Sequence, residues 1–202
     1  PWIEENAPAV VAAWWGGVEG GNATADVLFG NVNPGGRLPY TVYASESQVP
    51  SQDQYDVTQG FTYMYLKGEP LFAFGHGLSY TEFTYSNLKL SRERMGARET
   101  LTVSIDVENT GRRAGDEVVQ LYVRDLESRV TRPTKELRGF ERITLEPGQK
   151  KTVTIDLPGE KLAFYDEPSR AFVVEPGAFE VMVGGSSGDI RATGRFEVTS
   201  RL

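Results

Sequence analysis

The regular alternation of apolar and polar residues in the second half constrains the fold of this chain more than any other feature. The clearest run is Leu101, Thr102, Val103, Ser104, Ile105, Asp106 and Val107. It stops at Asn109-Thr110-Gly111, which is a turn signal. A period of two is typical of a strand with one buried face. The sequence therefore predicts a half-buried strand over residues 101–107.

Further short strands are predicted along the same half of the chain. They cover residues 118–123, 140–145, 153–157, 171–174, 178–183 and 195–198. Between them lie Glu146-Pro147-Gly148 and Glu175-Pro176-Gly177, where proline presets φ and glycine accepts a positive φ. Short strands at regular spacing without a helical stretch predict an antiparallel β-sandwich over residues 83–202. Because the chain has no cysteine, a fibronectin type III-like sandwich is expected rather than a disulfide-linked one.

Five aromatic residues fall within or beside these strand patterns, and we expect the core to bury them. They are Tyr122, Phe140, Phe172, Phe179 and Phe196.

Composition changes near Gly75-His76-Gly77. Residues 1–82 hold 2 basic and 9 acidic residues, whereas residues 83–202 hold 19 of each, so the whole net charge of -7 lies in the first part. The same 82 residues carry 13 of the 22 aromatic residues. A shift of this kind predicts a domain boundary there.

The first 45 residues predict one unit of an α/β sandwich. Residues 9–15 form an unbroken apolar run, as in a strand buried on both faces, although periodicity alone leaves a buried helix open. A glycine-rich turn follows, and Asn22 is a good N-cap for a helix that Gly30 would stop. One strand and one helix cannot bury both faces of a sheet, so we expect the rest of this domain to lie elsewhere.

Residues 46–82 lack periodicity and are interrupted by proline and glycine, which predicts a connector. A structureless stretch of this length is unusual inside a compact domain. We therefore expect it to lie packed on neighbouring domains through its aromatic side chains.

Composition excludes several function classes. Without cysteine the chain has no thiolate metal site and no cysteine nucleophile, and its one histidine, His76, cannot form a multi-histidine site. The acidic balance argues against phosphate contacts with nucleic acid. No stretch approaches the ~20 apolar residues of a membrane span. The glycine turn 16–21 matches no phosphate-binding motif, so we expect no cofactor.

Four residues are candidates for substrate contact. Glu19 and Trp15 lie where a parallel strand would end, which is where α/β folds place ligand contacts, although a carboxylate there is also a routine partner of the helix dipole. Tyr63 and Tyr65 would point to one face if the chain is extended, where they could stack on a sugar or pack between domains. No nucleophile elbow accompanies His76, so a structural role is expected for it.

Four motifs together resemble the C-terminal third of glycoside hydrolase family 3. They are residues 13–30 (AWWGGVEGGNATADVLFG), 33–39 (NPGGRLP), 70–81 (PLFAFGHGLSYT) and 135–140 (KELRGF), the last followed by 145–148 (LEPG). The resemblance covers nearly the whole chain, with the motifs in the order found in the family.

The resemblance implies a retaining β-glycosidase built from a (β/α)₈ barrel, an α/β sandwich and a fibronectin type III-like domain. In that family the nucleophilic Asp and the acid/base Glu belong to parts upstream of the segment seen here, so we expect no catalytic residue in this chain. The sugar, glucose or xylose, stays open. The alternative function is a non-catalytic module that binds polysaccharide or mediates association.

The resemblance also implies a partner. An unpaired sheet edge and an apolar patch at residues 9–15 should be covered by the N-terminal remainder of the same enzyme, with a homodimer as the alternative. Oligosaccharide would then be bound through that remainder. Because the chain begins at Pro1 without an initiator methionine, we expect Pro1 to be a cut end.

Overall fold

The structure, a computed structural model, describes residues 2–201. Its helices are α1 (Trp2–Asn6), α2 (Gly20–Leu28) and α3 (Thr62–Tyr65), with 3₁₀ turns at Glu46–Gln48, Val57–Gln59 and Gly159–Leu162. Its strands are β1 (Phe83–Leu90), β2 (Arg94–Met95), β3 (Thr100–Asn109), β4 (Gly115–Asp125), β5 (Glu136–Leu145), β6 (Lys150–Pro158), β7 (Phe164–Asp166), β8 (Ala171–Val173), β9 (Gly177–Ser186) and β10 (Asp189–Val198).

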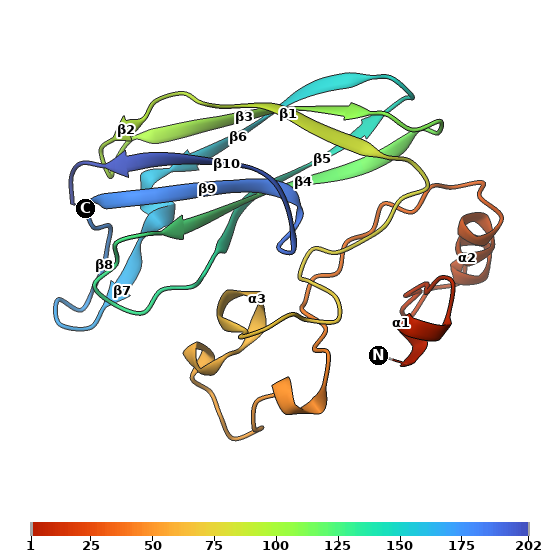
Figure 1. Cartoon of the computed structure of the whole chain (residues 1–202), viewed down its shortest axis with the longest axis horizontal. Coiled ribbons are helices and arrows are strands. Elements are labelled where there is room, and N and C mark those ends of the chain that lie inside the picture. The colour runs from red at the N-terminus through yellow and green to blue at the C-terminus, as the bar shows by residue number, and fades with distance from the viewer. Residues whose placement is uncertain (1, 202) are drawn as a thin grey trace.

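The strands form the predicted β-sandwich (Figure 1). One sheet has the order β1-β3-β6, the other has the order β2-β10-β9-β4-β5, and β7 and β8 form a separate hairpin. All neighbouring strands are antiparallel except β2 and β10, which pair in parallel. The mixed class that the sequence predicts, an α/β region followed by an all-β sandwich, is confirmed.

Alternation explains the core. In β3, every second residue from Leu101 to Asn109 is buried, and these side chains face the other sheet. The core is built from apolar side chains of both sheets, with Leu101, Leu121, Leu157 and Val181 fully buried. Asn109 is the polar exception, and its amide group donates to the carbonyl oxygens of Arg113 (2.7 Å) and Leu145 (2.9 Å). The buried amide is thus hydrogen-bonded, as a buried polar group must be.

Two of the five aromatic residues expected in the core lie outside it. Tyr122, Phe179 and Phe196 are buried, but Phe140 is 64% exposed and Phe172 is 69% exposed. The β4–β5 register shifts between Leu121 and Tyr122, and Phe140 lies on the outer face of the edge strand β5. Phe172 lies on β8, which pairs with β7 in a two-stranded sheet.

The strand predicted over residues 9–15 is not formed. These residues are extended or irregular and mostly exposed, with Val10 at 56% and Trp15 at 94%. A strand needs a neighbour to pair with its backbone groups, and the described chain supplies none here. Helix α2 does form, and it begins at Gly20 rather than after Asn22.

Residues 46–82 lie along the sandwich over part of their length (Figure 1). Tyr63 stacks on Phe74 with centroids 4.4 Å apart and meets Tyr122 of β4 edge-on at 5.8 Å. The amide of Ser187 donates to the carbonyl oxygen of Phe74 (2.9 Å). The division into segments 1–45, 46–82 and 83–202 stays a prediction. No helix in the described range is long and apolar enough to cross a bilayer.

Candidate functional site

Trp15 and Glu19 lie on the exposed surface just before α2. Glu19 is the N-cap residue of that helix, and its carboxylate accepts a hydrogen bond from the side-chain amide of Asn22 (2.5 Å). Trp15 lies beside Trp14, with ring centroids 6.3 Å apart. Figure 1 places α2 well apart from α3, which carries the two candidate tyrosines. The four candidate residues therefore do not form one site within this chain.

Tyr63 and Tyr65 do not share a face. The prediction assumed an extended chain, but Thr62–Tyr65 form one helical turn, which turns successive side chains by about 100°. The Tyr63 hydroxyl accepts a hydrogen bond from the backbone amide of Leu137 (3.0 Å), and burial raises the pKa of that hydroxyl. Tyr63 is therefore packed against the sandwich.

Tyr65 lines a cleft of about 600 Å³ between α3 and the β7–β8 hairpin. Phe164 and Tyr165 line the same cleft, and the guanidinium of Arg132 lies over the Phe164 ring, 4.8 Å from its centroid. Arg132 also pairs with Glu136 (3.2 Å) and with Asp125 (3.6 Å). The charges that face this cleft are thus largely paired within the protein.

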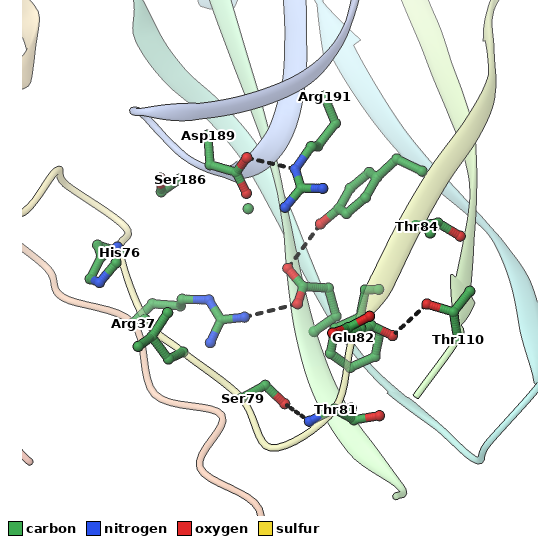
Figure 2. A pocket seen from close by; sticks show the side chains of 16 residues that line it. Arg37, His76, Ser79, Thr81, Glu82, Thr84, Thr110, Ser186, Asp189 and Arg191 are labelled. Atoms are coloured by element: carbon green, nitrogen blue, oxygen red, sulfur yellow. Dashed lines mark hydrogen bonds and ion pairs between the residues drawn. The ribbon is translucent and has the colours of Figure 1, made fainter. Parts of the chain in front are cut away.

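A second cleft, of about 550 Å³, lies where the connector meets the sandwich (Figure 2). Arg37 reaches into it from the segment before the connector, and its Nη2 lies 2.9 Å from Oε2 of Glu117 on β4. The other carboxylate oxygen of Glu117 accepts from the hydroxyl of Tyr85 on β1 (2.8 Å). Across the cleft, Nε of Arg191 lies 2.6 Å from Oδ1 of Asp189.

Burial sets the protonation behaviour of this cleft. It raises the pKa of Glu117, although Arg37 and the Tyr85 hydroxyl oppose the shift, and it raises the pKa of Tyr85 far above the ordinary range. It lowers the pKa of His76, and the nearby Arg37 charge lowers it further, whereas Asp189 opposes the shift. His76 stacks on Phe72 with centroids 5.2 Å apart, which fits the structural role expected for it.

This arrangement does not provide the chemistry of a glycosidase. Hydrolysis of a glycosidic bond needs one carboxylic acid with a raised pKa and a second, free carboxylate on the other side of the bond. Glu117 has the raised pKa, but its side chain is only 6% exposed and both its oxygens are engaged. Among residues 2–201, no group of three or more His, Asp or Glu side chains is placed to hold a metal ion.

The residues that build the second cleft were missed at the level of sequence, although two signals mark them. Arg37 is one of only two basic residues in the first 82. Glu117 occupies an inward position of β4, between the buried Gly115 and Val119, where alternation calls for an apolar side chain. An inward acid and an isolated base are natural candidates for a pair.

Two family models match the chain. Residues 1–80 match the model described as "Glycosyl hydrolase family 3 C-terminal domain", and residues 117–187 match the "Fibronectin type III-like domain". The two matches fall on the region of α1 to α3 and on the sandwich.

Relatives match at high identity over nearly the whole chain. The chain is 43% identical to "Thermostable beta-glucosidase B" of Acetivibrio thermocellus, covering 94% of this chain and 27% of that protein. It is 44% identical to "Beta-xylosidase" of Formosa agariphila, covering 92% of this chain and 26% of that protein. The crystal structure of the β-glucosidase from Kluyveromyces marxianus in complex with glucose superposes with a TM-score of 0.90 at 40% identity, covering all of this chain and 26% of that one. The chain thus spans about a quarter of the length of these relatives.

Proposed function

The chain belongs to glycosyl hydrolase family 3, matching the C-terminal domain and the fibronectin type III-like domain of its β-glucosidases and β-xylosidases, and we propose that it is the structural C-terminal portion of a retaining β-glycosidase. That enzyme would remove terminal β-linked glucose or xylose from oligosaccharides. The observation that carries the proposal is identity of 39% or more over at least 92% of the chain to relatives named for these two activities.

The catalytic carboxylates would lie outside residues 1–202. Glu117 and Asp189 both line the polar cleft. Each of these acids pairs with an arginine. Glu19, the acid beside the exposed tryptophans, is engaged with Asn22. A double displacement through a covalent glycosyl-enzyme would therefore depend on the remainder of the enzyme.

The partner in this proposal is the N-terminal remainder of the same enzyme. Of the large apolar side chains exposed among residues 2–201, fourteen lie between Trp2 and Val57 and six lie after Val57. A concentration of exposed apolar side chains in one region is typical of an interaction surface. Val18, Phe29 and Leu28, which lie within or beside α2, are exposed at 102%, 83% and 62%.

Activity assays test the catalytic part of the proposal. The purified 202-residue chain should leave p-nitrophenyl β-glucoside and β-xyloside intact. A hybrid in which this chain replaces the matching quarter of a family 3 relative should hydrolyse the substrate of that relative, whereas the same relative without the quarter should be inactive. Turnover by the 202-residue chain alone would show that the carboxylates lie within it.

A matched pair of variants tests the interface. Phe29→Asp should abolish activity of the hybrid, because it places a charge on the apolar face near α2. Phe140→Asp is the control, since Phe140 is also exposed, at 64%, but lies on the outer side of β5. Equal activity of the two hybrids would contradict the placement of the interface.

A second candidate function, binding of polysaccharide by the sandwich, is favoured by one observation. Tyr165 and Phe172 face one another across the β7–β8 pair and are 53% and 69% exposed. Their rings are 5.5 Å apart at an interplanar angle of 70°, so they offer one sugar-stacking face each rather than a flat strip. Retardation of the chain in gels that contain soluble xylan or β-glucan, lost in Phe172→Ala and kept in Phe140→Ala, would support this function.

A further inference from the structure

The segment between α2 and the connector contacts the sandwich at three successive positions, Gly30, Asn33 and Arg37. The guanidinium of Arg113 donates to the carbonyl oxygen of Gly30, and Nδ2 of Asn33 donates to the carbonyl oxygen of Ala114 (3.0 Å). Arg37 then pairs with Glu117 at 2.9 Å. Residues 30–37 thus run along residues 113–117, and we call these two stretches together the clasp.

The clasp also holds the point where the chain enters the sandwich. Oδ1 of Asn33 accepts from the hydroxyl of Ser79 (3.0 Å) and from the backbone amide of Tyr80 (2.8 Å). The hydroxyl of Tyr80 in turn donates to the carbonyl oxygen of Val27 at the end of α2 (2.9 Å). Asn33 therefore joins residues 79–80 to Ala114, just before β4, and the Tyr80 hydroxyl joins them to α2.

Arg37 closes the clasp at its far end. Its side chain is 10% exposed and that of Glu117 is 6% exposed, so the pair is shielded from water and from salt. The next residue, Leu38, exchanges backbone hydrogen bonds with the connector, donating to His76 (2.8 Å) and accepting from Gly75 (2.8 Å). The fit is tight, because a Cβ at Gly77 would lie 2.1 Å from the carbonyl oxygen of Gly36.

We infer that the clasp fixes the orientation of α2 relative to the sandwich, and that the buried Arg37–Glu117 pair is the element that keeps it closed. The pair joins two segments eighty residues apart and has no role in either sheet ladder. Removal of one partner from a buried pair leaves the other charge uncompensated, which is costly. The expected response is local opening of the clasp over an intact sandwich.

Hydrogen exchange of the 202-residue chain, followed by mass spectrometry, tests this inference. In Arg37→Met the amides of Leu38, Gly75 and Tyr80 should exchange ~10-fold faster or more, while amides of β3 and β9 keep their rates. Arg142→Met is the matched control, because Arg142 pairs with Asp116, next to Glu117, but is 60% exposed. It should leave all these rates within about twofold of the wild type.

The double variant tests whether Arg37 and Glu117 act as one pair or independently of each other. Arg37→Met combined with Glu117→Gln should open the clasp no further than Arg37→Met alone, because both changes break the same pair. Unchanged exchange at Leu38 and Tyr80 in Arg37→Met would overturn the inference. It would also be overturned by a rise of equal size in β3 and β9, since the pair would then support the sandwich as a whole.

Discussion

The sandwich and the region before it differ in how far they bury their large apolar side chains. In residues 83–201 two sheets bury each other's apolar faces, and the side chains of Leu101, Leu121 and Leu157 are removed from water completely. In residues 2–57 no large apolar side chain is fully buried, and Trp15 and Phe29 are among the most exposed in the described chain. One region contains its own core, whereas the other leaves its large apolar side chains exposed.

The connector shows how the two regions are held together despite this difference. Most contacts of the connector and of the segment before it with the sandwich are polar, such as those of Asn33 and Arg37, and Tyr63 adds an aromatic contact. Polar contacts of this kind can fix the orientation of a neighbouring segment. They bury little apolar surface, so they do not provide that segment with a hydrophobic core. If the proposed N-terminal partner covers the first region, that region should gain most of its stability from it, whereas the sandwich should be stable without it.

The largest expected effect contrasts the same residue type in the two regions. Leu121→Ala, in the core, should lower the free energy of unfolding by ~2–5 kcal/mol. Leu28→Ala, on the exposed face of α2, should change it by less than ~0.5 kcal/mol. Urea unfolding of both variants, monitored by the far-UV circular dichroism of the sheets, measures the difference. Similar losses would show that the first region shares a core with the sandwich.

A smaller effect is expected at the aromatic anchor. Tyr63→Phe removes the acceptor of the Leu137 amide and should cost about 0.5–1.5 kcal/mol of docking free energy, seen as faster exchange of that amide. Tyr55→Phe is the control, since Tyr55 is 89% exposed. A change in the urea midpoint of the sandwich in Tyr63→Phe would sharpen the comparison, because the connector would then belong energetically to the sandwich.

Most of the sandwich could be predicted from the sequence because alternation is a local signal. The strands that escaped prediction are those in which the signal is broken or too short. In β1 the register shifts between Ser86 and Lys89, and Asn87 has a positive φ of 55°, so its alternation is interrupted. Strand β7 consists of Phe164, Tyr165 and Asp166, which show no alternation of apolar and polar residues.

The polar cleft could not be predicted because its members are far apart in sequence. Arg37 and Glu117 are eighty residues apart, and although each is unusual in its own segment, their pairing depends on how the two segments pack. The apolar run 9–15 misled for a related reason, since its character suits a strand but the partners of that strand are not in the described chain. Local patterns predict elements, whereas sites depend on how distant elements pack.

The smallest expected effect is a difference in pH dependence between two aspartates, one in each region. Hydrogen bonds from Ser169 and the guanidinium of Arg129 lower the pKa of Asp166, on β7, from 3.8 to about 2. Hydrogen bonds from Thr58 and Gln59 also lower the pKa of Asp56, in the connector. A lowered pKa in the folded state stabilises the fold above the ordinary pKa, and this contribution is lost as the pH falls through the folded pKa.

Only one of these aspartates should report on the sandwich. Asp166→Asn should lower the free energy of unfolding at pH 7, and its difference from the wild type should shrink between about pH 4 and pH 2, where Asp166 itself becomes protonated. Asp56→Asn should leave sandwich unfolding unchanged at every pH, because the partners of Asp56 all lie within two or three residues of it. Urea unfolding at pH 7, 4 and 2 measures both. A pH-dependent loss of unfolding free energy in Asp56→Asn would mean that the connector unfolds together with the sandwich. The boundary between the self-contained region and the dependent one would then lie at residue 46 instead of residue 82.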